Sequence, residues 1–408
     1  MNIGFVSEAL PYLPSRGGFR LYGGNLIRCL SRRHTIDLIA FLRDDDEQHL
    51  NWPRQYCASV SGLPGNGASM PMRLANVGSA YLWGAPIVGR KQLAARLQEG
   101  LAAGRWDVLH VEGEYAGGLI SVDLPVAKVL SLHDSWTLRA EEMLKCAQDW
   151  RQKLYYRFLQ YHEPRYERLV YPRFERCTVV AGPDLDEVRK TVPSAKVDLI
   201  SYGTDTEYFH PVEVTKQPDT LVFHSHLGYP PNIEAALEFA NEIFPVIRRE
   251  APGATFHLVG ADPDPKVREL GSRPGIKISA NLPDLRSAVC SAGIYVCAIR
   301  YGTGLKSKML EAMAMQMPIV AYHPGSTVGI DCMYGEHLLA ATTPQEFAAH
   351  VLYLRKNPAK ADEMAKAARK LVCEKYSWES RARAYEELYQ QVKEERQRIS
   401  HGYAKQSA

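Results

Sequence analysis

Short apolar runs alternate with longer amphipathic segments along most of this chain of 408 residues. In the first half, the apolar runs predict strands at residues 3–7, 35–41, 107–111, 127–132, 178–181 and 197–200. In the second half, they predict strands at residues 220–224, 254–260, 275–279, 294–298 and 318–322, with helices between them, such as one at residues 232–250. This alternation is typical of βαβ units and parallel sheets.

Residues 205–219 interrupt the alternation, because they include Pro211 and Pro218 and have no clear period. The length suits two or three hydrophobic cores, and we expect two. The pattern therefore predicts an α/β protein with two Rossmann-like, doubly wound parallel-sheet domains, residues 1–205 and 206–376. We expect the domains to face a cleft at the carboxyl ends of their strands, where open α/β folds bind ligands.

Two long helical segments fall outside this simple repeat. Residues 138–176 predict two helices that are broken near Pro164. Residues 378–396 predict one final helix, whose apolar side contains Trp378, Ala382 and Tyr385, followed by Leu388. This helix is either an appended surface helix or a segment that crosses back to the first domain.

Composition and charge narrow the class of partner. The chain is 46% apolar and 23% charged, as is ordinary for a globular protein, and its net charge of +3 is too small to favour nucleic acid as the main partner. The eight cysteines are scattered without a C-x-x-C pair, the first residues lack the features of a signal peptide, and no run of 18 apolar residues occurs. We therefore expect action in the cytoplasm, with peripheral contact to the inner membrane face left open.

A basic segment is the candidate for such membrane contact. Its cations are Arg151, Lys153, Arg157, Arg165, Arg168 and Arg173. Basic clusters of this kind bind anionic lipids. Here, however, Glu163, Glu167 and Glu175 interrupt the positive charge along the sequence.

The loop after the first strand contains Gly17 and Gly18 and leads into a helix predicted at residues 23–33. A strand–loop–helix of this kind directs backbone N–H groups and a helix N-terminus at an anion such as phosphate. A tight turn without a ligand is the alternative. The spacing differs from G-x-G-x-x-G, so the nicotinamide-binding fingerprint is absent.

Residues 302–314 form the strongest group of chemically active positions. Gly302 and Gly304 precede a helix, Lys306 or Lys308 can neutralise a diphosphate, and Glu311 can accept hydrogen bonds from two ribose hydroxyls. A nucleotide sugar presents these groups. The alternative is a solvated helix face, which the apolar neighbours of Lys308 and Glu311 make less favourable.

Residues 302–314, followed by residues 317–321 and 335–339, resemble the donor-site region of glycosyltransferase family four. Other segments are similar to the junction between that family's domains and to its exopolysaccharide-associated subgroup: residues 202–205, 208–211, 229–232, 243–245 and 376–379. The resemblance implies the GT-B fold, with a helix at residues 377–397 that returns to the first domain. It also implies retaining, hexosyltransferase-like transfer without a metal or other cofactor. The donor would be a UDP- or GDP-sugar, and the acceptor hydroxyl would belong to a glycan, a glycolipid or a small molecule.

The resemblance assigns roles to individual residues. His133 matches the family's cleft histidine, which can hydrogen-bond a sugar hydroxyl, and Gly18 faces donor phosphate and acceptor; with Lys308 these are the expected catalytic residues. Glu311 matches the ribose-binding glutamate. The full expected donor site is Gly17, Gly18, His226, Gly302, Thr303, Gly304, Leu305, Lys306, Lys308 and Glu311.

Two departures from the family pattern keep other functions open. Thr303 stands where the family has the earlier of two glutamates, and His224, Ser225 and His226 replace a basic pair. A catalytically silent nucleotide-sugar-binding protein of the same fold therefore remains an alternative, as does a nucleotide-sugar epimerase or a glycan phosphorylase. The Asp-x-Asp patterns at residues 44–46 and 262–264 are interpreted as solvated loops and not as metal sites.

Overall fold

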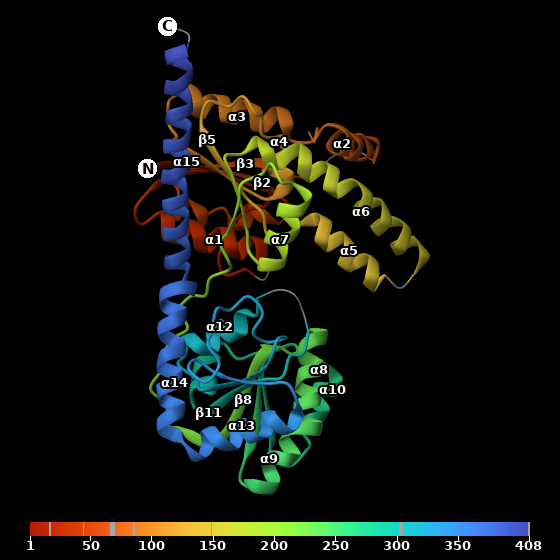
Figure 1. The fold of residues 1–408 in the computed structure, drawn as a ribbon, viewed down its shortest axis with the longest axis vertical. Coiled ribbons are helices and arrows are strands. Elements are labelled where there is room, and N and C mark those ends of the chain that lie inside the picture. The colour runs from red at the N-terminus through yellow and green to blue at the C-terminus, as the bar shows by residue number, and fades with distance from the viewer. Residues whose placement is uncertain are drawn as a thin grey trace. The chain divides into compact units, whose positions relative to one another are not determined.

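The computed structural model describes residues 1–15, 18–43, 45–65, 70–84, 86–147, 149–301 and 305–406. The chain divides into two compact units. The first unit combines Met1–Ser201 with Arg381–Ala408, and the second is Tyr202–Ser380. Each unit has a parallel sheet with helices packed against it (Figure 1).

Within the described residues, the sheet of the first unit has seven strands in the order β3-β2-β1-β4-β5-β6-β7. The strands are β1 (Asn2–Ser7), β2 (Thr35–Leu42), β3 (Ser59–Pro64), β4 (Val108–Glu112), β5 (Ala127–Ser131), β6 (Arg176–Val179) and β7 (Val197–Leu199). The helices are α1 (Gly18–Leu30), α2 (Met70–Trp83), α3 (Arg90–Ala102), α4 (Glu114–Leu119), α5 (Trp136–Cys146), α6 (Trp150–Val170) and α7 (Gly182–Thr191). Strands β4 and β5 are buried along their whole length, so the polar residues within them, His110 and Glu112 in β4 and Lys128 and Ser131 in β5, need partners inside the fold.

The sheet of the second unit has six described strands in the order β10-β9-β8-β11-β12-β13. The strands are β8 (Gln217–His226), β9 (Thr255–Ala261), β10 (Ile276–Ala280), β11 (Ala292–Cys297), β12 (Ile319–Tyr322) and β13 (Leu339–Ala341). The helices are α8 (Pro230–Glu238), α9 (Phe244–Glu250), α10 (Pro265–Leu270), α11 (Arg286–Cys290), α12 (Ser307–Ala314), α13 (Pro344–Lys356) and α14 (Pro358–Leu371). A π-helical turn at Phe239–Ile243 joins α8 to α9.

The predicted break near Pro164 is wrong, because Pro164 lies inside α6. The chain instead leaves the helical conformation before Asp149, whose carboxylate accepts hydrogen bonds from the backbone N–H groups of Arg151 and Gln152. This cap starts α6 at Trp150. A proline removes only one backbone hydrogen bond, and the buried residues Glu163 and Tyr166 beside it hold the helix in place.

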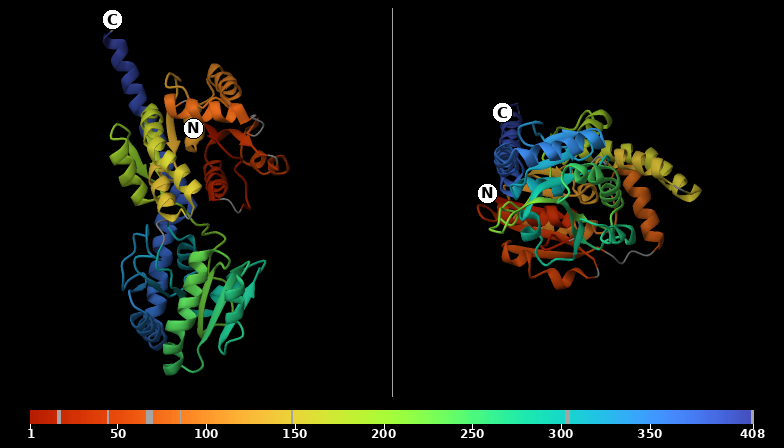
Figure 2. Two further views of the ribbon diagram at one scale, coloured as in Figure 1. Left: turned by 90° about the vertical axis from the view of Figure 1, so that its right-hand side faces the viewer. Right: turned by 90° about the horizontal axis from the view of Figure 1, so that it is seen from below.

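The last helix, α15 (Trp378–Gln406), returns to the first unit, as the resemblance implied (Figures 1 and 2). Its predicted apolar side is buried, together with Tyr389 and Val392. At the start of α15, the backbone N–H of Trp378 donates to the carbonyl of Thr204, and the N–H of Thr204 donates to the carbonyl of Tyr376. Two of the segments that carry the family resemblance therefore pair with each other.

Among the described residues, no helix combines the length and the apolar character needed to cross a bilayer.

Candidate functional site

The order of strands in each sheet locates a candidate binding region. In the first unit the order reverses between β1 and β4, and in the second unit it reverses between β8 and β11. Parallel sheets bind ligands outside the carboxyl ends of their strands at such points. In the first unit these ends lead to Glu8 and Glu112, and in the second they lead to His226 and the segment before α12.

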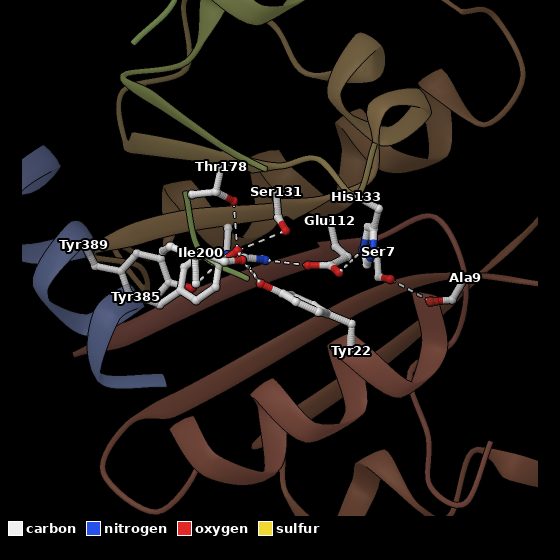
Figure 3. A network of polar contacts seen from close by, with 11 residues as sticks. Ser7, Ala9, Tyr22, Glu112, Ser131, His133, Thr178, Ile200, Tyr385 and Tyr389 are labelled. Carbon is white, nitrogen blue, oxygen red and sulfur yellow. Dashed lines mark hydrogen bonds and ion pairs between the residues drawn. The ribbon is translucent and has the colours of Figure 1, made fainter. Parts of the chain in front are cut away.

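Glu112 and His133 form the centre of the site in the first unit (Figure 3). The Glu112 carboxylate is fully buried and accepts from Nε2 of His133 at 2.6 Å and from Nε2 of His110 at 2.8 Å. Burial raises the pKa of Glu112, but the hydrogen bonds and charges of His110 and His133 outweigh it and lower that pKa to about 2. Because an ionised carboxylate only accepts, Nε2 of each histidine carries a proton.

His133 lies just after β5 and is 8% exposed. The rings of Phe19 and Tyr22, both on α1, contact its imidazole at centroid distances of 4.6 and 4.9 Å. The imidazole is thus held by a carboxylate on one side and by aromatic rings on the other. His133 thus lies at the carboxyl end of a strand, as the sequence predicted, and its binding of a ligand stays a prediction.

The network around Glu112 extends to α15 (Figure 3). Nδ1 of His110 lies 2.7 Å from the Tyr389 hydroxyl. The Tyr385 hydroxyl lies 3.0 Å from that of Tyr22, 3.1 Å from that of Ser131 and 2.8 Å from that of Thr178. The returning helix therefore contributes directly to the polar layer beneath His133.

Two more carboxylates lie beside β1 and β4, the half-buried Glu8 and the buried Glu114. Burial raises the pKa of Glu8 and, more strongly, that of Glu114. The Glu8 carboxylate accepts from the backbone N–H of Tyr115 at 3.0 Å. Gly113, between them, has φ +99°, and a Cβ there would overlap the Glu8 carboxylate, so glycine is required. The strand ends thus hold acidic groups with very different proton affinities.

Glu311 is the best-defined group of the site in the second unit. It lies on α12, and its Oε2 accepts from Nε2 of His224 at 2.8 Å. The side chain of His224 is 3% exposed, whereas that of Glu311 is 20% exposed. The structure therefore brings together a predicted ribose-binding carboxylate and one of the histidines that replace the family's basic pair.

Lys306 and Lys308 lie at the start of α12, where Lys306 is the residue before the first helical turn. Burial, followed by the charge of Lys308, lowers the pKa of Lys306. Two cations at a helix N-terminus create a positive potential that suits a diphosphate. Leu305, next to them, packs against the core of the second unit.

Three polar atoms near the end of β8 are buried without a hydrogen-bond partner among the described residues. They are Nδ1 of His224, Oγ of Ser225 and Oδ1 of Asn232. Buried polar atoms are nearly always hydrogen-bonded, so such a group indicates a place where a ligand or water supplies the missing partner.

The other predicted residues are placed as follows. Gly18 is the first residue of α1 and is exposed. His226 is 56% exposed and has Nε2 3.5 Å from an Asp262 oxygen. Gly17, Gly302, Thr303 and Gly304 lie outside the described residues.

Sequence reasoning missed Glu112, Glu8 and the pairing of His224 with Glu311. A signal for Glu112 was present in the sequence, because His110 and Glu112 are two polar residues within the predicted strand and its end. Polar residues in a buried strand need hydrogen-bond partners. In the described part of the chain, no cluster of three histidine, cysteine or acidic side chains is arranged to hold a metal ion. The Asp264 carboxylate instead caps α10 by accepting from the backbone N–H of Lys266.

Comparisons with known proteins agree with this architecture. The family model described as Glycosyltransferase Family 4 matches residues 16–208, and the model described as Glycosyl transferases group 1 matches residues 218–357. A Klebsiella pneumoniae protein, described as an uncharacterized 44.6 kDa protein in the cps region, is 22% identical over 387 residues, which cover 91% of this chain and 95% of that protein.

Solved structures share the fold over nearly the whole length. Sucrose-phosphate synthase from Thermosynechococcus elongatus is 14% identical with a TM-score of 0.62, over 96% of this chain and 99% of that chain. Anabaena HepE in complex with UDP is 13% identical with a TM-score of 0.62, over 96% of this chain and 100% of that chain.

Proposed function

Because the chain belongs to glycosyltransferase family four, we propose that it is a retaining transferase that moves a sugar from a nucleotide-sugar donor to a hydroxyl group of an acceptor. The observation that carries this proposal is the grouping of Lys306, just before α12, with Lys308 and Glu311 on α12, where His224 holds Glu311. Cations and a carboxylate on one short helix match the diphosphate and ribose of a nucleotide.

The second unit binds the nucleotide. Glu311 accepts hydrogen bonds from the ribose hydroxyls, while His224 fixes the direction of its carboxylate. The diphosphate binds to Lys306, Lys308 and the N-terminus of α12. Burial lowers the pKa of Lys306, and a buried site of this kind also removes water from the ligand that it binds. We include His226, Leu305 and the residues Gly302, Thr303 and Gly304 in this donor site on the strength of the family resemblance.

The first unit contacts the sugar and the acceptor. His133, held by Glu112, donates or accepts a hydrogen bond at a sugar hydroxyl. Gly17 and the amide of Gly18 at the start of α1 stabilise phosphate oxygens.

The structure of HepE with UDP favours a uridine nucleotide as donor, with a GDP-sugar as the alternative. The cps-region relative favours a role in polysaccharide biosynthesis, with a glycan or glycolipid precursor as acceptor and a cytoplasmic site of action.

The reaction is a front-side displacement. The bond between the anomeric carbon and the diphosphate oxygen breaks, the acceptor oxygen bonds to the same face of that carbon, and the acceptor proton passes to the leaving diphosphate. The protein positions both reactants and stabilises the negative charge on the departing diphosphate, so it needs neither a strong base nor a metal.

The test is to incubate the purified chain with a panel of UDP-, GDP-, ADP- and dTDP-sugars and candidate acceptors, and to determine the product's anomeric configuration by NMR. We expect a product with the donor's configuration. An inverted product would overturn the retaining mechanism. Tight donor binding without transfer or hydrolysis would identify a silent binding protein, and an isomerised donor formed without acceptor would identify an epimerase.

A further inference from the structure

The outward side of α6 carries a row of large apolar side chains. Trp150, Leu154, Phe158 and Tyr161 are 69%, 64%, 42% and 78% exposed. Their spacing of four, four and three residues places them on one face of the helix. Helices α5 and α6 form an antiparallel pair that extends away from the seven-stranded sheet (Figures 1 and 2), so this face is exposed within its unit.

The opposite side of α6 has partners within the first unit. Tyr156, Leu159 and Glu163 line a hollow of about 390 Å³ together with Tyr81 of α2 and residues of α5. Glu163 accepts from the Tyr81 hydroxyl at 2.7 Å. The core contacts of the helix are therefore supplied mainly by this inner side. Phe158, at the border of the exposed row, also contacts the Tyr81 ring at a centroid distance of 5.7 Å, but packing does not account for Trp150, Leu154 and Tyr161.

The acidic residues that interrupt the basic segment in the sequence do not interrupt it in space. Glu163 and Glu167 are 5% and 0% exposed, and Glu167 accepts from Ser135 and Thr137. Glu175 lies beyond the end of α6 and pairs with Arg396 at 2.5 Å. The expectation that these three residues break the positive charge is therefore wrong for the outer face of α6.

The six cations also divide into two groups. Arg165, Arg168 and Arg173 donate to backbone carbonyls of Tyr81, Thr191 and Leu169. Arg151, Lys153 and Arg157 are exposed beside the apolar row, and the described residues supply no acidic partner for their side chains. Asp149, the carboxylate nearest in the sequence to Arg151 and Lys153, is engaged in capping the helix.

We infer that the α6 outer face, defined by Trp150, Leu154, Phe158, Tyr161, Arg151, Lys153 and Arg157, binds the surface of an anionic lipid bilayer. An exposed apolar row rich in Trp and Tyr suits the boundary between headgroups and acyl chains, and flanking cations suit lipid phosphates. This charge complementarity selects anionic lipid over an apolar groove on another protein. The inference does not rest on the proposed sugar transfer, because a chain without transferase activity would bind in the same way.

The test is sedimentation of the full chain with vesicles of phosphatidylcholine alone or mixed with phosphatidylglycerol. We expect the protein to pellet with the anionic vesicles, and we expect salt to weaken binding as it shortens the Debye length from about 10 Å at 0.1 M to about 3 Å at 1 M. Arg151→Glu with Arg157→Glu should reduce binding at least about tenfold, as should Trp150→Ser with Leu154→Ser.

Matched controls lie on the second unit. Lys356→Glu with Lys370→Glu changes the net charge equally, and Tyr353→Ser removes an aromatic side chain that is 47% exposed on α13; both should bind like the wild type. Quenching of Trp fluorescence by brominated anionic lipid, lost in Trp150→Phe, gives a second readout that needs no charge change. Wild-type protein that stays in the supernatant, or α6 variants that pellet like the wild type, would overturn the inference, and the former result would direct attention to a protein partner.

Discussion

Glu311 is the residue through which the donor site can be tested most directly. Its 20% exposed carboxylate accepts from a nearly buried His224, so it is oriented before any ligand arrives. A carboxylate fixed in this way loses little rotamer entropy when it accepts ribose hydroxyls. The nucleotide binding that we propose for the second unit thus depends on a pair of residues that lie on different elements.

We predict that Glu311→Ala weakens nucleotide-sugar binding by about 10–100-fold, since two hydrogen bonds to a charged acceptor are lost at about 1.5–3 kcal/mol each before water replaces them. Lys308→Ala should mainly lower kcat, because its charge acts on the departing diphosphate. Isothermal titration with the active nucleotide sugar and steady-state kinetics measure the two effects. Glu363→Ala, at a side chain 71% exposed on α14, is the control. Wild-type affinity and turnover in both site variants would show that the donor site does not lie at α12.

A second prediction at the scale of single residues concerns Glu112. Its pKa of about 2 in the folded chain lies below the ordinary value of 4.5. The ionised carboxylate therefore stabilises the fold above pH 4.5, and this contribution is lost as the pH falls from about 4.5 towards about 2. Glu112→Gln should remove that pH dependence and should destabilise the first unit by about 2–4 kcal/mol at neutral pH, because an amide oxygen cannot serve both histidines equally well.

Urea unfolding at neutral and acidic pH measures the effect, and Glu363→Gln provides a matched exposed control. If Glu112 positions His133 for the reaction, kcat should also fall and recover in part in Glu112→Asp, which keeps the charge. Unchanged stability and turnover in Glu112→Gln would refute the role of this carboxylate.

At the scale of elements, the sequence predicted most of the strands, because burial on both faces of a sheet favours runs of apolar residues. Each of the eleven predicted strands overlaps an observed one. Nine of them lie inside the sheets, where burial on both faces favours apolar residues, and two, β7 and β10, lie at sheet edges. The strands that were missed, β3 and β13, lie at sheet edges, and β3 has a single buried residue, Leu63. A strand that faces solvent needs no continuous apolar run, so its sequence carries a weaker signal.

The candidate site was less predictable than the fold. His133 and Glu311 could be singled out because polar residues at strand ends or in apolar helices are unusual. Their partners Glu112 and His224 could not, since these pairings join positions 21 and 87 residues apart in the chain. Local patterns determine which face of an element is buried, whereas the direction of a side chain depends on partners that only the folded sheet brings together.

At the scale of the whole molecule, α15 joins the end of the chain to the polar layer of the first unit. Ion pairs join the exposed side of α15 to the rest of the first unit. Lys393 pairs with Asp107 at 2.7 Å, and Glu395 pairs with Arg176 at 2.6 Å. These partly exposed pairs contribute little each. The buried hydroxyl of Tyr385 contributes more, because its three neighbouring hydroxyls have been removed from water.

We therefore predict that Tyr385→Phe destabilises the first unit by about 1–3 kcal/mol, since Tyr22, Ser131 and Thr178 each lose a buried partner. Because the chain consists of two compact units, calorimetry should show the transition of the first unit shifted downward by several degrees while that of the second unit stays in place. Tyr353→Phe, at an exposed tyrosine of α13, should move neither transition. A variant whose two transitions shift together would show that α15 stabilises the molecule as one cooperative body, and one with no shift would show that the hydroxyl contributes nothing.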